Sequence, residues 1–97
     1  MEIKTTLVGS SLTLAPQGRV DTITAPELET AINNQIGEVG ELIVDLDAVD
    51  YISSAGLRVL LSAQKKMAGR RLLLKNACAA VKEVFDITGF SDIFTFG

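Results

Sequence analysis

Residues 41–56 read ELIVDLDAVDYISSAG, and this stretch decides the fold. Its apolar run at 42–44 is short and contains the β-branched Ile43 and Val44, which is typical of a strand covered on both faces. A segment with three aspartates follows, and small residues at 53–56 then precede a long amphipathic pattern. The stretch therefore predicts a core strand, a loop and the start of a helix in succession.

The amphipathic pattern after this stretch predicts a helix over residues 55–68. Polar side chains such as Arg58 and Lys65 fall on one side of it and apolar side chains fall on the other. Gly69 is a natural stop, because glycine readily takes the left-handed conformation that ends many helices. The apolar side consists of Leu57, Leu60, Leu61, Ala63 and Met67.

Two strands and a helix are predicted before this unit. Residues 2–8 and 11–17 are expected to form a hairpin that ends before Gly18, because Leu12 and Leu14 alternate with polar neighbours.

The helix after this hairpin is expected to run from Thr24 to about Ile36. Thr24 and Glu27 have the spacing of a capping box, and Pro26 is tolerated in the first helical turn. The face predicted to point inward carries Leu28, Ala31, Ile32 and Ile36.

Another strand and helix are predicted after this unit. Residues 71–75 have the pattern of a core strand, residues 79–88 that of a helix, and residues 90–96 leave room for a short edge strand. The predicted order is ββαβαβα in one domain over residues 1–97. Strands separated by helices pair in parallel through right-handed crossovers, whereas the opening hairpin is antiparallel. The expected fold class is α/β, a mixed sheet with helices packed on it.

The composition excludes several functions. The chain of 97 residues has a net charge of −3, which argues against the basic surface of a nucleic-acid-binding protein. It has no histidine and one cysteine, Cys78, so the commonest catalytic sets and any internal disulfide are missing. No run approaches the ~18 apolar residues of a membrane span, and the N-terminus lacks the pattern of a signal peptide. We expect a cytoplasmic protein that is not an enzyme and binds neither nucleic acid nor membrane.

Three aspartates, Asp45, Asp47 and Asp50, lie near the end of the predicted core strand. Carboxylates at such spacing could hold Mg²⁺. Aspartate is also common in turns, where its side chain hydrogen-bonds the nearby backbone. We favour a polar loop, and therefore predict neither a metal site nor a cofactor.

Ser53 and Ser54 lie at the predicted junction of loop and helix. A serine at this position can cap the helix through its hydroxyl. It can also be phosphorylated, which adds about −1.5 to −2 charges near neutral pH. Free N–H groups at a helix start accommodate such a group, so the fold would survive while a partner surface would meet a new charge. The residues alone leave both roles open.

Three separated segments resemble the STAS domains, in the branch of the anti-sigma factor antagonists. They are VDL with YISSAGLRVLL at 44–61, GRVD with TAPEL at 18–28, and VFDITGF with IF at 84–94. The resemblance covers nearly the whole chain. It implies a STAS fold and the function of partner switching.

In this family, the unphosphorylated antagonist binds an anti-sigma factor that is also a serine-protein kinase, and binding releases a sigma factor or another client. The kinase phosphorylates the antagonist and abolishes binding, and a serine phosphatase reverses the modification. The resemblance places Ser54 at the acceptor position and Ser53 where many members have aspartate, so Ser53 is the alternative acceptor. The partner-binding residues that it implies are Asp21, Thr22, Ser53, Ser54, Ala55, Gly56 and Arg58.

Two alternatives stay open. The chain could be a STAS interaction scaffold that does not switch, such as a subunit associated with a transporter. Asp21 falls on a family aspartate before the first helix, and it could equally be a turn residue next to Thr24.

Overall fold

The computed structural model describes residues 1–97 and confirms the predicted α/β class. Each predicted strand and helix is present, and the ends of all but the closing strand differ from the prediction by no more than a residue or two. The strands are β1 (Ile3–Val8), β2 (Ser11–Pro16), β3 (Gly18–Val20), β4 (Glu41–Asp45), β5 (Val49–Ile52), β6 (Arg71–Lys75) and β7 (Thr95–Phe96). The helices are α1 (Ala25–Gln35), α2 (Ser54–Lys66) and α3 (Ala79–Thr88).

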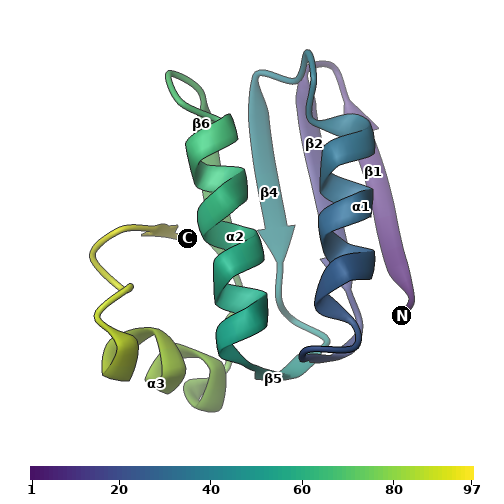
Figure 1. The fold of residues 1–97 in the computed structure, drawn as a ribbon. Coiled ribbons are helices and arrows are strands. Elements are labelled where there is room, and N and C mark those ends of the chain that lie inside the picture. The colour runs from purple at the N-terminus through teal and green to yellow at the C-terminus, as the bar shows by residue number, and fades with distance from the viewer.

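The main sheet has five strands in the order β1-β2-β4-β6-β7. As predicted, β1 and β2 form an antiparallel hairpin, and the other neighbouring strands pair in parallel. The helices α1 and α2 lie side by side over one face of this sheet (Figure 1). None of the helices has the length and apolar content needed to cross a membrane.

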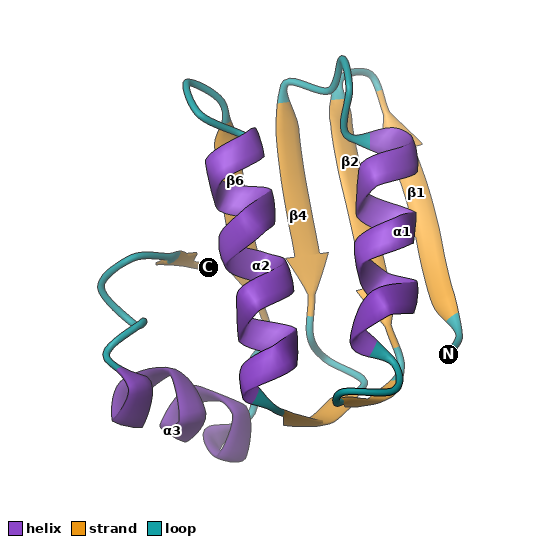
Figure 2. Ribbon diagram, in the orientation of Figure 1, coloured by secondary structure: helices purple, strands orange, loops and turns teal.

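The hydrophobic core fills the layer between the sheet and these two helices. On β4 and β6, every second side chain is buried, whereas Ile43 and Leu73 between them are only partly buried. The expectation that residues 41–46 are covered on both faces is therefore wrong. The reason is that α1 and α2 pack on the same face of the sheet (Figure 2).

The structure contains a second, two-stranded sheet that the sequence analysis did not predict. In it, β3 pairs with β5 in parallel, with Arg19 opposite Tyr51 and Val20 opposite Ile52. The prediction ended strand structure before Gly18 and placed a loop where β5 lies, and both of these expectations are wrong. The pair lies at the end of the molecule where α1 and α2 begin (Figure 1).

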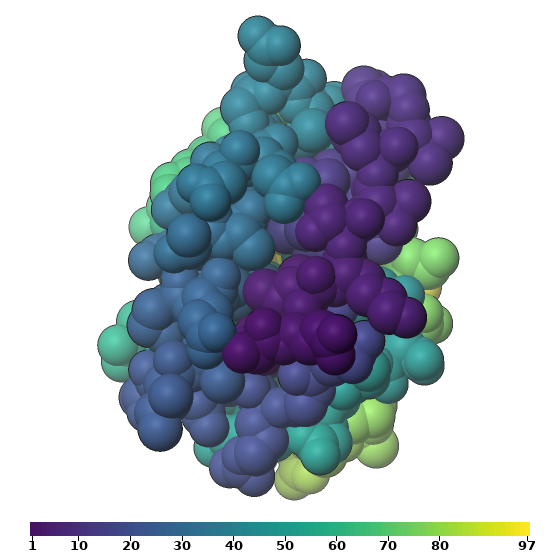
Figure 3. Space-filling model, turned by 90° about the vertical axis from the view of Figure 1, so that its right-hand side faces the viewer, coloured from purple at the N-terminus to yellow at the C-terminus, as the bar shows by residue number.

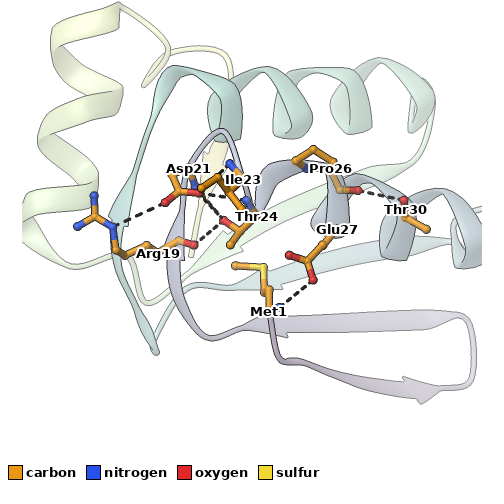
Figure 4. A network of polar contacts seen from close by, with 8 residues as sticks. All are labelled: Met1, Arg19, Asp21, Ile23, Thr24, Pro26, Glu27 and Thr30. Carbon is orange, nitrogen blue, oxygen red and sulfur yellow. Dashed lines mark hydrogen bonds and ion pairs between the residues drawn. The ribbon is translucent and has the colours of Figure 1, made fainter.

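The predicted capping box at the start of α1 does not form. The Thr24 hydroxyl donates to the Arg19 carbonyl oxygen at 2.6 Å and accepts from the Asp21 N–H at 2.9 Å (Figure 4). The Glu27 carboxylate accepts from the amino group of Met1 at 2.8 Å, and the first residues of the chain lie against α1 (Figure 3). Thr24 is thus engaged by the chain just before it, and Glu27 by a residue distant in the sequence, so neither side chain is left for the capping box.

Arg70 binds the C-terminal ends of both α1 and α2, at the end of the molecule opposite to the β3–β5 pair. Its guanidinium donates to the carbonyl oxygens of Ile36 (2.9 Å), Gly37 (3.2 Å), Val39 (2.8 Å) and Lys66 (2.9 Å). Carbonyl groups at the end of a helix lack partners within the helix, and positive charge is favourable there. One side chain therefore ties the C-terminal ends of both helices together.

The last helix, α3, lies beside β5 and away from α1 (Figure 1). Val81 and Phe85 are its buried residues. The Phe85 ring makes edge-to-face contacts with Phe94 at 5.5 Å and Phe96 at 5.2 Å between centroids. These aromatic contacts hold the closing strand β7 against the core.

Candidate functional site

The pairing of β3 with β5 brings two distant segments together. Because the strands are parallel and Val20 is opposite Ile52, the residues that follow, Asp21 and Ser53, leave the sheet side by side. The N–H of Ser53 donates to the Val20 carbonyl oxygen at 2.8 Å and so continues the pairing by one step. The loop before α1 and the start of α2 therefore form one surface.

The two serines at the start of α2 have different surroundings. Ser54 is the first residue of the helix and is exposed. Ser53 precedes it in extended conformation, and its hydroxyl is buried without a hydrogen-bond partner. Of the two roles that the sequence leaves open for a serine here, capping is not seen, because no serine side chain caps this helix. Only the Ser54 side chain is therefore open to another molecule.

Gly56 lets α2 approach the β3–β5 pair. A Cβ atom at this position would lie 2.7 Å from Cγ1 of Ile52 and 2.7 Å from Cγ1 of Val20, closer than carbon atoms can pack. Gly56 is itself buried, and Ala55 is half-buried. Among the predicted partner-binding residues, these two support the surface from beneath.

Asp21 fixes the loop before α1. Its Oδ1 atom accepts from the N–H of Ile23 at 2.9 Å, from the N–H of Thr24 at 3.1 Å and from the Thr24 hydroxyl at 3.2 Å (Figure 4). Its Oδ2 atom lies 3.8 Å from Nε of Arg19. The backbone hydrogen bonds lower the pKa of Asp21 most, and the Thr24 hydroxyl and Arg19 lower it further. Asp21 thus has the role of a turn residue at the candidate site.

Three residues of this surface are absent from the prediction. Ile23, in the loop that Asp21 fixes, is 80% exposed and is the most exposed large hydrophobic side chain of the structure. Tyr51 is 39% exposed, and the Arg19 guanidinium lies over its ring at 4.3 Å. An isoleucine within a polar loop was a signal available in the sequence. The contact of Arg19 with Tyr51 was not, because it depends on the β3–β5 pairing.

The remaining predicted residues are exposed. Thr22 lies in the loop after β3, and Arg58 lies one helical turn after Ser54. The guanidinium of Arg58 makes no hydrogen bond or ion pair.

The aspartates near β4 and β5 do not converge on a point. The Asp45 Oδ1 atom accepts from the N–H of Asp47 at 3.0 Å and from the Asn76 amide at 3.0 Å, as expected of a turn residue. Asp50 lies on β5 and is exposed. No group of three or more carboxylate or cysteine side chains is placed to hold a metal ion.

Fold and surface together define an α/β domain that presents a serine at the start of its second helix. The family model of the STAS domain matches residues 2–97. BtrV of Bordetella bronchiseptica, assigned as an anti-sigma factor antagonist, is 42% identical over 82 residues, which cover 80% of this chain and 70% of BtrV. The anti-sigma-B factor antagonist of Listeria monocytogenes is 37% identical over 79 residues, covering 78% of this chain and 69% of that protein.

Solved structures agree in fold. The unphosphorylated anti-sigma factor antagonist SpoIIAA matches with a TM-score of 0.83 at 18% identity, covering 99% of this chain and 88% of that chain. The Bacillus SpoIIAA in its phosphorylated form matches with a TM-score of 0.74 at 17% identity, covering 99% and 91%. The chain belongs to the STAS domain family, in the branch of the anti-sigma factor antagonists. Like these relatives, it is a regulatory protein and not an enzyme.

Proposed function

We propose that this protein is a phosphorylation-controlled antagonist in a partner-switching pathway. The unphosphorylated form binds an anti-sigma factor that is also a serine kinase, and binding releases the client of that factor. Phosphorylation of Ser54 abolishes binding, and a serine phosphatase restores it. The exposed hydroxyl of Ser54, at the start of α2 and beside the loop that Asp21 fixes, is the observation that carries this proposal.

Accessibility favours Ser54 over Ser53 as the acceptor. Phosphoryl transfer requires the hydroxyl oxygen to approach the γ-phosphate in line with its leaving group. The Ser53 hydroxyl is buried, and its N–H is bonded to the carbonyl oxygen of Val20, so it could reach a kinase only if β5 and α2 separated. Ser54 needs no such rearrangement. SpoIIAA, which shares the fold, has been solved both with and without phosphate.

The surface around Ser54 has the features of a partner-binding site. Asp21 holds Ile23 outward on a loop fixed by hydrogen bonds, so a partner can bury this side chain with little loss of conformational entropy. Burial of an isoleucine contributes about 1.5–3 kcal/mol, which is roughly a tenfold or larger change in affinity. A phosphate on Ser54 places a doubly negative group at this surface, which opposes docking through its desolvation.

The acceptor is tested by incubating the protein with its cognate kinase and ATP and locating the phosphate by mass spectrometry. We expect modification at Ser54 in the parent protein and in S53A, and none in S54A. Ser53→Ala is the matched control because it removes the neighbouring hydroxyl and leaves the exposed one. Modification confined to Ser53, or no modification in any form, would refute the proposed acceptor.

Binding to the kinase is measured separately by calorimetry. We expect Ser54→Asp to weaken binding and Ser54→Ala to bind like the parent while no longer switching. I23A should bind about tenfold more weakly. Equal affinity of the parent, S54A and S54D would contradict the switch. Together with co-purification of a transporter instead of a kinase, that result would favour the interaction scaffold.

A further inference from the structure

Arg58 lies on α2 four residues after Ser54, and both side chains are exposed. Residues four apart on a helix have neighbouring side chains, with Cβ atoms about 5–6 Å apart. The guanidinium of Arg58 has no hydrogen-bond or ion-pair partner, and the first turn of α2 has no acidic residue to compete for it. Arg58 is therefore an unused cation within reach of the proposed phosphorylation site.

We propose that Arg58 binds the phosphate group of phosphorylated Ser54 within the same helix. The inference rests on the proposed phosphorylation of Ser54. A guanidinium presents paired N–H donors that match two phosphate oxygens, and such charge-assisted hydrogen bonds are stronger than neutral ones. The order is also favourable, because a negative group placed four residues before a positive one agrees with the helix dipole.

Arg19, the other arginine at this end of the molecule, is already engaged. Its guanidinium lies over the Tyr51 ring at 4.3 Å, and its Nε atom is 3.8 Å from the Asp21 carboxylate. A phosphate would have to draw Arg19 away from both groups. Arg58 would give up only water.

This contact gives phosphorylation two effects on the surface. The phosphate adds negative charge next to the partner-facing loop, and it also neutralises Arg58, a cation that is free for an acidic group of a partner in the unmodified protein. Phosphorylation thus removes one docking group in addition to introducing repulsion.

The experiment uses full-length protein with phosphoserine inserted at position 54 during translation, so that no kinase is needed. The phosphate is titrated by ³¹P NMR in the parent, R58Q, R58K and K65Q forms. A nearby cation favours the dianion, so we expect a higher second pKa of the phosphoserine in R58Q than in the parent. In R58K, the second pKa of the phosphoserine should return most of the way to its value in the parent. K65Q, which removes an exposed charge near the other end of α2, should leave the pKa unchanged.

Asp21 on the neighbouring loop and Arg19 on β3 are present in every form, so their influence on the phosphate cancels in the comparison. Urea unfolding supplies a second readout. R58Q should raise the equilibrium constant for unfolding about twofold relative to the parent, and only in the phosphorylated protein.

A second pKa that is the same in R58Q and the parent would overturn the inference, since the phosphate would then be held by backbone N–H groups or by water. That result would leave the switch at Ser54 intact. Failure of the cognate kinase to modify Ser54 would refute the proposed function instead, whatever the titration shows.

Discussion

Substitution of Gly56 by alanine tests how closely α2 must approach the β3–β5 pair. The added Cβ atom would lie 2.7 Å from Cγ1 of Ile52 and 2.7 Å from Cγ1 of Val20, which are 1% and 0% exposed. Both neighbours are branched at Cβ and have little freedom to turn away. Overpacking of this kind costs typically 1–3 kcal/mol, and two contacts with stiff neighbours place G56A near the upper value.

Alanine is also a better helix former than glycine, by about 1 kcal/mol. The net loss expected for G56A is therefore about 2 kcal/mol, or roughly thirtyfold in the folding equilibrium constant. Urea unfolding followed by circular dichroism measures this difference. Gly37→Ala is the matched control, because a Cβ atom at position 37 has no neighbour within 4 Å and the backbone is not left-handed there. G37A should change stability by less than about 0.5 kcal/mol.

The double variant V20A/G56A identifies the cause. Val20→Ala removes one of the two Cγ1 atoms that would lie 2.7 Å from the added Cβ atom, so the double variant should be more stable than the sum of the two single effects predicts. G56A as stable as the parent, or effects that simply add, would refute the claim that close approach at Gly56 is needed. Because the clash pushes α2 from the sheet that orients Ser54, G56A should also be phosphorylated more slowly.

Three further outcomes follow from the contacts described. R70A should lower the free energy of unfolding in urea by about 2 kcal/mol, because the C-terminal ends of two helices lose their donor. R71A should lower it by less than about 0.5 kcal/mol, because the ion pair of Arg71 with Glu41 lies at the surface. The stabilisation from Asp21 should be fully present above its ordinary pKa of 3.8 and disappear as the pH falls through the lower pKa of the folded state. In D21N, the free energy of unfolding should therefore decline less over this acid range than in the parent. An equal decline in both proteins would contradict the role of this carboxylate. S53A should be as stable as the parent or up to about 1 kcal/mol more stable in thermal unfolding, because the hydroxyl that it removes is buried without a partner, and a clear loss would show that the hydroxyl is bonded.

Much of the fold was predictable from periodicity. Leu12 and Leu14 on β2 are buried as their alternation indicates, and so are Leu42 and Val44 on β4, although Ile43 between them is only partly buried. The strands β3 and β5 were missed because they have three and four residues and no alternation. On β5, Val49 and Ile52 are buried while the two residues between them are exposed, which resembles a polar loop when read locally.

The candidate site was predictable in part. The serine pair and Asp21 stand out in the sequence, and the structure brings them to one surface. Two features could not be foreseen from the sequence pattern. Thr24 and Glu27 have the spacing of a capping box, but the Arg19 carbonyl and the amino group of Met1 engage them instead. The burial of the Ser53 hydroxyl and the exposure of Ser54 likewise cannot be told apart from two adjacent serines in the sequence.

The parallel pairing of β3 with β5 has a consequence for recognition. Residues 21–24 and 53–58 are separated in the sequence by α1 and β4 and are neighbours only in the folded chain. The surface is therefore a discontinuous epitope and not a linear motif. A peptide spanning residues 47–61 would carry the serine without Asp21 or Ile23 beside it, and would be a poor substrate for any enzyme that reads both segments. Such an enzyme would act on folded molecules and not on nascent or denatured chains. Phosphorylation would then be confined to protein that is folded and able to bind its partner.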